Sequence, residues 1–249
     1  NFDYQGVKYT PQSFAKMLNL KADHYATLTS YTHQPVYTDF ILGIPDNWAN
    51  GTFYNVALND LVKQAKTALK EGFTLAWDAD VSNSGFNSKE GIAVVPVKGE
   101  KANFELTAPE MEVTAALRQE QFDNYTVTDD HLMHIVGLVK GVDGKEYFVV
   151  KNSWGDERGL DLYKGHVLVS EAYFKMNTIS VLLHKDALLK KLKKYITSSR
   201  MKLMKKNMQQ QIVNGALVVR IRVTTVMGTE LLSVQNVTER VKYRMMVKI

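Results

Sequence analysis

The stretch from His131 to Gly155 contains residue types suited to proton transfer: a histidine, His134, precedes a short turn, and an asparagine, Asn152, follows it. When an asparagine carbonyl oxygen accepts the imidazole N–H, it fixes the tautomer and leaves the other ring nitrogen free to activate a thiol. An isolated pair of this kind is more often structural, with the histidine at a strand end and the asparagine in a turn. The flanking sequence is therefore needed to choose between the two interpretations.

A β-hairpin is predicted to carry the two residues. Apolar runs at Ile135–Val139 and Tyr147–Val150 flank the turn signal Val142-Asp143-Gly144. If these three residues form the loop, with Gly144 in the left-handed conformation, Gly141 faces Lys145. The same-face pairs are then Lys140 with Glu146, Leu138 with Phe148, Val136 with Val150, and His134 with Asn152. A two-residue Asp143-Gly144 loop would move His134 to the other face, so we expect the longer loop.

The same register assigns roles to two further residues. His131 lies outside the paired positions, so it is expected to be a loop histidine. Trp154 is expected to fill the core and also to cover the His134–Asn152 hydrogen bond with its indole, which would keep water from competing for that bond.

The residues Asn152-Ser153-Trp154-Gly155, after an apolar strand and an upstream histidine, resemble the asparagine motif of papain-like cysteine peptidases. More narrowly, the whole stretch resembles the bleomycin hydrolase and aminopeptidase C branch, in which the histidine begins a run like HAMVLTGV and a VENSWG-type block follows. Segments 169–174 and 178–188 are similar to the same branch. The resemblance covers about residues 1–188 and is absent beyond them.

This resemblance implies a cysteine-type aminopeptidase that hydrolyses peptides, with His134 as base and acid and Asn152 orienting it. It implies no cofactor and no metal, and it implies a cytoplasmic location and a ring-shaped hexamer. The chain has no cysteine, so it contains no nucleophile for this reaction. We expect the cysteine and the glutamine of the oxyanion hole to lie in a missing part upstream of Asn1, and this chain alone to be inactive.

A second hypothesis makes the chain a non-catalytic, truncated relative that binds peptides through the old cleft or anions through a basic tail. Residues 189–249 contain 14 Lys and Arg against 2 Glu, whereas residues 1–188 contain 17 basic and 24 acidic residues. A basic segment attracts nucleic acid or anionic lipid. The tail is expected to be such a binding module, a solvated disordered tail, or sequence joined by a frameshift.

The predicted fold class is α+β. Residues 1–188 are expected to form mainly the β-barrel-like half of a papain-like fold with helical insertions, and residues 189–249 a basic extension of unknown fold. With 45% hydrophobic residues the chain can bury a core, and no run approaches the roughly 20 apolar residues of a membrane span. No signal sequence is visible. Without its partner half, the domain is expected to expose apolar surface.

Sequence patterns also place the individual elements. Residues 23–53 are predicted to form loops and short strands, and Phe73–Val81 a strand. Residues 189–196 read as a basic amphipathic stretch, and alternation around Val219–Val223 and Val241–Val247 suggests a small β-meander with a turn at Gly228. Helices are predicted from Thr10 to about Asn19, from an Asn59 cap to Glu71, and over Met111–Arg118.

Two carboxylates, Asp78 and Asp80, lie two residues apart at the end of the predicted strand. On a strand they would point to the same side, as a paired-carboxylate or metal site requires. They lack further ligands at EF-hand spacing, and the residues that follow fit a plain turn equally well. The remaining histidines are scattered and indicate no metal cluster; they are His24, His33, His166 and His184.

Overall fold

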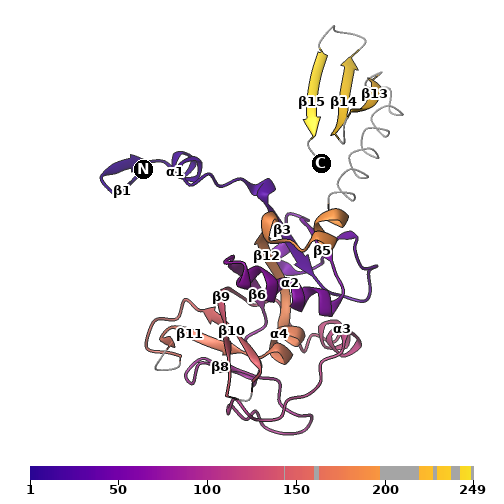
Figure 1. The fold of residues 1–249 in the computed structure, drawn as a ribbon. Coiled ribbons are helices and arrows are strands. Elements are labelled where there is room, and N and C mark those ends of the chain that lie inside the picture. Colours follow the sequence, from indigo (N-terminus) through magenta and orange to yellow (C-terminus); the bar gives the residue numbers. More distant parts are fainter. Residues whose placement is uncertain (143, 160–162, 197–218, 227–228, 237–241, 248–249) are drawn as a thin grey trace. The chain divides into compact units, whose positions relative to one another are not determined.

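The computed structural model describes residues 1–142, 144–159, 163–196, 219–226, 229–236 and 242–247 (Figure 1). The chain divides into two compact units, Asn1–Ile196 and Thr197–Ile249. Four parts of the sequence predictions lie outside the described residues: Asp143 of the hairpin loop, residues 197–218 of the tail, the turn at Gly228, and Val241.

The second unit contains a three-stranded antiparallel sheet. Its strands are β13 (Val219–Val226), β14 (Thr229–Asn236) and β15 (Lys242–Val247), paired in that order. This is the meander that the alternating pattern indicates.

One mixed sheet organises the first unit. Its strand order is β4-β5-β3-β12-β6-β9-β10-β11-β8-β7, in which β3–β5 and β8–β11 are parallel and the other neighbours antiparallel. The strands are β3 (Tyr25–Thr29), β4 (Asp39–Ile41), β5 (Thr52–Asn55), β6 (Leu75–Ala79), β7 (Phe86–Asn87), β8 (Ile92–Ala93), β9 (His131–Lys140), β10 (Glu146–Lys151), β11 (His166–Val169) and β12 (Thr178–His184). A separate hairpin is made by β1 (Phe2–Tyr4) and β2 (Val7–Tyr9). The fold therefore combines helices with a large sheet.

The helices of this unit begin at different kinds of residue. Helix α1 (Pro11–Met17) starts as predicted, because the Thr10 and Ser13 side chains each accept a hydrogen bond from the other's backbone N–H. The predicted Asn59 cap is wrong: α2 (Leu58–Lys70) follows Ala57, which makes no side-chain cap. Helix α3 (Ala115–Asp123) begins later than the predicted Met111, because the Thr114 hydroxyl accepts from Leu117 N and starts the helix there. The fourth helix is α4 (Glu171–Asn177).

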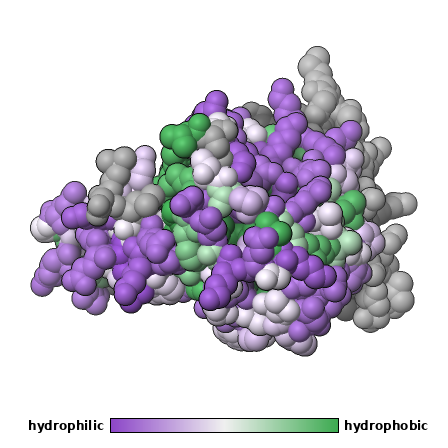
Figure 2. Space-filling view, turned by 90° about the horizontal axis from the view of Figure 1, so that it is seen from below, coloured by the Kyte–Doolittle hydropathy of each residue, from purple (hydrophilic) through white to green (hydrophobic). Residues whose placement is uncertain are grey.

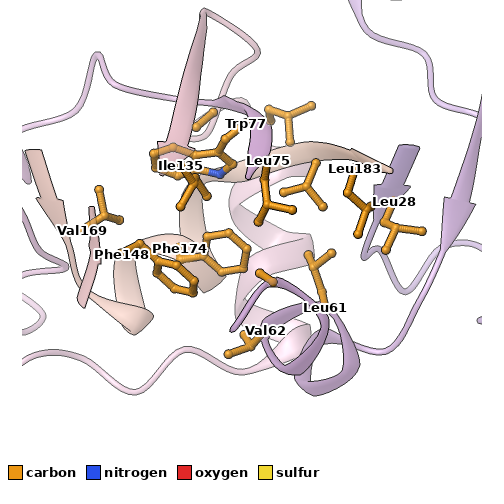
Figure 3. Packing of buried hydrophobic residues seen from close by; sticks show 14 of the residues in the cluster. Leu28, Leu61, Val62, Leu75, Trp77, Ile135, Phe148, Val169, Phe174 and Leu183 are labelled. Carbon is orange, nitrogen blue, oxygen red and sulfur yellow. The ribbon is translucent and has the colours of Figure 1, made fainter. Parts of the chain in front are cut away.

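The core lies between the central strands and helices α2 and α4. Figure 3 shows Leu61 and Val62 of α2 and Phe174 of α4 directed toward apolar side chains of the strands. Trp77 of β6 is fully buried and its indole N–H donates to Thr178 Oγ1 at 2.8 Å. Because α2 is apolar along one face, it covers this face of the sheet. Gly72, just after the helix, has φ of 85° and lets the chain turn into β6.

The first unit continues past Leu188, the residue beyond which no resemblance to the peptidase branch was expected. The chain is helical over 190–196, and Leu192 and Ile196 are buried in the main core. The Gln64 side chain of α2 holds this segment, because it donates to Ala187 O and accepts from Leu189 N, each at 2.7 Å. The amphipathic start of the tail is therefore packed against the body rather than solvated.

Apolar groups also remain at the surface. Figure 2 shows hydrophobic surface lying between hydrophilic regions on one face of the molecule. The most exposed large side chains include Trp48 at 85%, Tyr125 at 83% and Leu132 at 66%. In the part of the chain that the structure describes, no helix has the length and apolar character needed to cross a membrane.

Candidate active site

The hairpin that was predicted to carry the site forms between β9 and β10, and its turn has the predicted register. Gly141 N donates to Lys145 O at 2.8 Å, and Gly144 has φ of 81°, as the three-residue loop requires. Lys140 then pairs with Glu146 and Leu138 with Phe148. Near the turn, both the loop length and the pairing are confirmed.

Farther from the turn the register changes. Val149 pairs with Gly137, but Val150 pairs with Ile135, so Val136 is an extra residue in β9. Such a bulge adds one residue to one strand and reverses the facing of every later side chain on it. The two hydrophobic clusters agree, because Ile135 and Leu138, three residues apart, pack on the main core while Val136 packs with a smaller cluster.

The bulge makes the predicted pairing of His134 with Asn152 wrong. His134 lies across from Lys151 and is exposed to solvent. His131 lies at the start of β9 on the same face as the buried Met133 and Ile135, and its Nε2 lies 2.9 Å from Asn152 Oδ1. The expectation that His131 is a loop histidine is also wrong, because it pairs with Ala79 of β6.

The contact between His131 and Asn152 defines a tautomer. An amide oxygen can only accept, so Nε2–H of His131 donates, and Nδ1 carries a lone pair that is free to take a proton. Asn152 is itself fixed, because its backbone N donates to Gly165 O at 3.0 Å and its Oδ1 also accepts from Ser153 N at 2.7 Å. Its Nδ2 is buried and has no hydrogen-bond partner among the described residues.

Trp154 covers this hydrogen bond, as predicted, although over a different histidine. It does not fill the core, because it is 41% exposed. Its ring stacks on the His131 imidazole with a centroid distance of 4.8 Å and an interplanar angle of 26°. Phe86 meets the indole edge-on, and the Arg158 guanidinium lies 5.8 Å from its centroid. Stacking keeps water away from one side of the imidazole, so the His131–Asn152 bond is formed in a less polar environment than bulk solvent.

Two carboxylates that accept hydrogen bonds from backbone N–H groups hold the entry to β9. Asp80 is 1% exposed, and its Oδ2 accepts from Thr128 N at 2.8 Å. The Asp130 side chain accepts in return from Val81 N at 2.9 Å. These two reciprocal bonds join the segment before His131 to the end of β6, so the imidazole extends from a fixed backbone.

Asp78 and Asp80 do not form a pair. Asp80 accepts from Ser82 N and Asn83 Nδ2 with one oxygen, which is the plain turn that the sequence allows. Asp78 is half-buried, and its hydrogen-bonded carboxyl partner is Asp129. Within the described ranges, no group of three or more His, Asp or Glu side chains is arranged to hold a metal ion.

Comparisons with known proteins match most of the chain to one peptidase family. Residues 1–207 match the model of the Peptidase C1-like family, so the expectation that the resemblance is absent beyond residue 188 is wrong. Aminopeptidase G of Lactobacillus delbrueckii subsp. lactis is 26% identical over 198 residues, which are 78% of this chain and 43% of that protein. The crystal structure of PepW from Lactobacillus rhamnosis HN001 superposes with a TM-score of 0.59 at 23% identity, again over 78% of this chain and 43% of that one.

Both relatives are longer than this chain. This chain spans less than half the length of either protein. The structural superposition shows a shared fold over 78% of this chain, and the family match covers residues 1–207. The chain belongs to the peptidase C1-like family.

Proposed function

We propose that this chain supplies the histidine and the asparagine of a cysteine-type aminopeptidase, with His131 as general base and acid and Asn152 as the residue that orients it. The observation that carries the proposal is the 2.9 Å contact between His131 Nε2 and Asn152 Oδ1 beneath the Trp154 ring. Membership of the peptidase family and the name of the relative Aminopeptidase G support the reaction class.

The 249 residues of this chain include no cysteine. In this proposal the thiol therefore belongs to a segment outside the chain. His131 Nδ1 takes the thiol proton, and the sulfur attacks the carbonyl carbon of the first peptide bond. The imidazolium then protonates the leaving amine as the C–N bond breaks. In the second half, His131 takes a proton from water, the water oxygen bonds to the acyl carbon, and the sulfur leaves as a thiolate.

Asn152 acts throughout by accepting the Nε2–H of His131. The bond keeps the ring in the tautomer with a free Nδ1 and stabilises the imidazolium when it forms. A hydrogen bond to a charged group contributes about 1.5–3 kcal/mol, so Asn152→Ala is expected to lower kcat/KM roughly tenfold to a hundredfold. This is a positioning effect, because Asn152 contacts the imidazole and not the reacting atoms.

Turnover by the product of the complete reading frame tests the proposal. The assay measures release of a fluorescent amine from an aminoacyl coumarin amide, with and without a reducing agent. His131→Ala is expected to lower kcat about 10²- to 10⁴-fold. His134→Ala is the matched control and is expected to leave kcat unchanged, because His134 is exposed on the opposite face of the same strand. A reading frame without cysteine, or loss of activity in His134→Ala with retention in His131→Ala, contradicts the proposal.

A second measurement needs only the present chain. ¹⁵N NMR of the His131 ring is expected to show a protonated Nε2 and an unprotonated Nδ1. Asn152→Ala should remove this preference, because the acceptor that selects the tautomer is lost. A His131 ring with the Nδ1–H tautomer in the unchanged protein would contradict the assignment of Nδ1 as the base.

The second candidate function is a non-catalytic module that binds peptides or anions. The observation that favours it is the absence of cysteine from the chain. Binding of a labelled RNA to the basic tail should weaken steeply between about 50 and 200 mM salt, because each neutralised phosphate releases counterions. Binding of a neutral peptide in the cleft should barely respond to salt, so the salt dependence separates the two modes.

A further inference from the structure

Beside the His131–Asn152 pair, we infer that Arg158 binds a carboxylate in the part of a peptide substrate that leaves with the amine. The inference rests on the proposed function, because it adds a specificity-determining residue to the same site. Two sources in a peptide supply this chemistry: the C-terminal carboxylate of a short peptide, and an acidic side chain just after the cleaved bond.

One indole ring connects Arg158 to the imidazole. Trp154 stacks on His131 with a centroid distance of 4.8 Å, and the guanidinium carbon of Arg158 lies 5.8 Å from the Trp154 centroid. The guanidinium is therefore at most about 11 Å from the imidazole centre, a gap that two peptide residues of about 3.5 Å each and a hydrogen bond at either end can bridge. A carboxylate one or two residues beyond the leaving amine can reach Arg158 while the amine meets His131.

The position of Arg158 is fixed by its own segment. Its Nη1 donates to Ser88 Oγ at 2.9 Å, and its carbonyl oxygen accepts from Gly165 N at 2.7 Å. The next residue, Gly159, donates its backbone N–H to Ser88 O at 2.9 Å. Because both the backbone and the side chain are held, the guanidinium loses less conformational freedom when a ligand binds than an unrestrained arginine would.

Most of the hydrogen-bond donors of this guanidinium remain available. It has five N–H groups, and the bond to Ser88 occupies one of them. Asp156 and Glu157 precede Arg158 in the chain, but within the described ranges neither forms an ion pair with it. Arg158 is exposed, so a ligand can approach it. The planar fork of an arginine matches a carboxylate with two parallel hydrogen bonds.

The ligand lies on a surface in this inference and not in a cavity. Asn152, Trp154 and Arg158 line a common hollow of about 10 Å³, which is the space of about one water molecule. Trp154 is 41% exposed, so a peptide can lie against its ring on the way to Arg158. An exposed ion pair is weak and is screened by salt, so Arg158 gives a preference for carboxylates and not an absolute requirement.

NMR titration of the 249-residue chain tests the inference without any turnover. The probes are glycylglycine, which ends in a carboxylate; glycylglycinamide, which has none; and aspartic acid α-amide, whose carboxylate is on the side chain. Glycylglycine is expected to shift the Trp154 indole N–H and the Arg158 Nε–H resonances, and to bind about fivefold more tightly than glycylglycinamide, as one exposed ion pair implies. Arg158→Gln should remove this difference. Lys16→Gln, which removes an exposed cation of α1, is the matched control and should keep it.

Each outcome decides the inference. Tighter binding of aspartic acid α-amide than of glycylglycine supports the carboxylate site and identifies acidic side chains as its ligands, whereas the reverse order identifies the C-terminal carboxylate of short peptides. Equal affinity for glycylglycine and glycylglycinamide, or a difference that persists in Arg158→Gln, overturns the inference. A difference that Lys16→Gln abolishes as well reflects overall charge and also overturns it. Because no turnover is measured, failure here is distinguishable from failure of the proposed catalytic role.

Discussion

Arg118→Met is the substitution with the most definite expected cost. Arg118 is 1% exposed and bonds four carbonyl oxygens: its Nε donates to Ser30 O at 2.7 Å, one terminal nitrogen donates to Lys175 O at 2.9 Å and Met176 O at 3.2 Å, and the other donates to Thr178 O. Two of these oxygens end helix α4, where a cation is also favoured by the helix dipole. The side chain thus joins α3 to the end of α4 and to β3.

The magnitude follows from this bonding. Hydrogen bonds to a charged group contribute about 1.5–3 kcal/mol each to stability. The cost of removing the guanidinium from water offsets several kcal/mol of their sum. Leaving the carbonyls without their donor is therefore expected to lower the free energy of unfolding by about 3 kcal/mol, which corresponds to a decrease in Tm of roughly 6–12 °C at this chain length.

Urea unfolding followed by circular dichroism measures the change. Arg118→Lys keeps the charge but not the planar fork, so it is expected to lie between the wild type and Arg118→Met. Arg158→Met is the control, because Arg158 is exposed and its bond to Ser88 Oγ is at the surface; its effect should stay within about 0.5 kcal/mol. A free energy of unfolding for Arg118→Met within about 1 kcal/mol of the wild type would refute the bonding argument.

Three other substitutions have defined outcomes. Trp154→Ala should speed solvent exchange of the His131 Nε2–H, observed by NMR, because the stacked indole is lost; unchanged exchange would mean that the indole does not shield the bond. Gly159→Ala should cost about 1–3 kcal/mol in urea unfolding, because φ is 104° and a Cβ would lie 2.5 Å from His166 O; wild-type stability would contradict that strain. The raised pKa of Asp78 means that the folded state binds the extra proton, so stability should fall as pH rises from 3.8 to about 8. Asp78→Asn should lose this dependence, and an unchanged pH profile would count against the raised pKa.

Local signals predicted the parts of the fold that depend on neighbours in sequence. Thr10 and Ser13 form the capping box expected at the start of α1, and Gly144 adopts the conformation expected at the hairpin turn. Asn59 failed as a cap because Ala57 already has the extended backbone that precedes the helix, and packing of Leu58 sets the first turn. Capping preference is weaker than burial of an apolar face.

The histidine was misassigned because a bulge leaves little trace in sequence. Counting from the turn gives the wrong face after Val136, whereas counting from the other end gives the right one. Met133 and Ile135 are buried on either side of the exposed His134, but Leu132 and Val136 next to them are also apolar. The sequence of β9 therefore lacks a clear alternation that would have placed His131 toward the core.

Contacts between distant segments were beyond sequence reasoning. Asp78 meets Asp129 only because β6 and β9 are neighbours in the sheet, and Gln64 meets Leu189 only because α2 packs beside the C-terminal helical segment. Neither pair has a periodicity or a motif. The first contact follows from strand order and the second from helix packing, and the sequence leaves both open.

The extra residue at Val136 divides the hairpin into two halves of opposite phase. A change of loop length at the turn would alter the pairing between the turn and Val136. The residues from His131 to Ile135 would keep the same buried and exposed faces. In a continuous register that paired every residue from the turn, His134 rather than His131 would lie opposite Asn152 on the core side. The one extra residue at Val136 therefore decides which of two histidines in the same strand can meet Asn152.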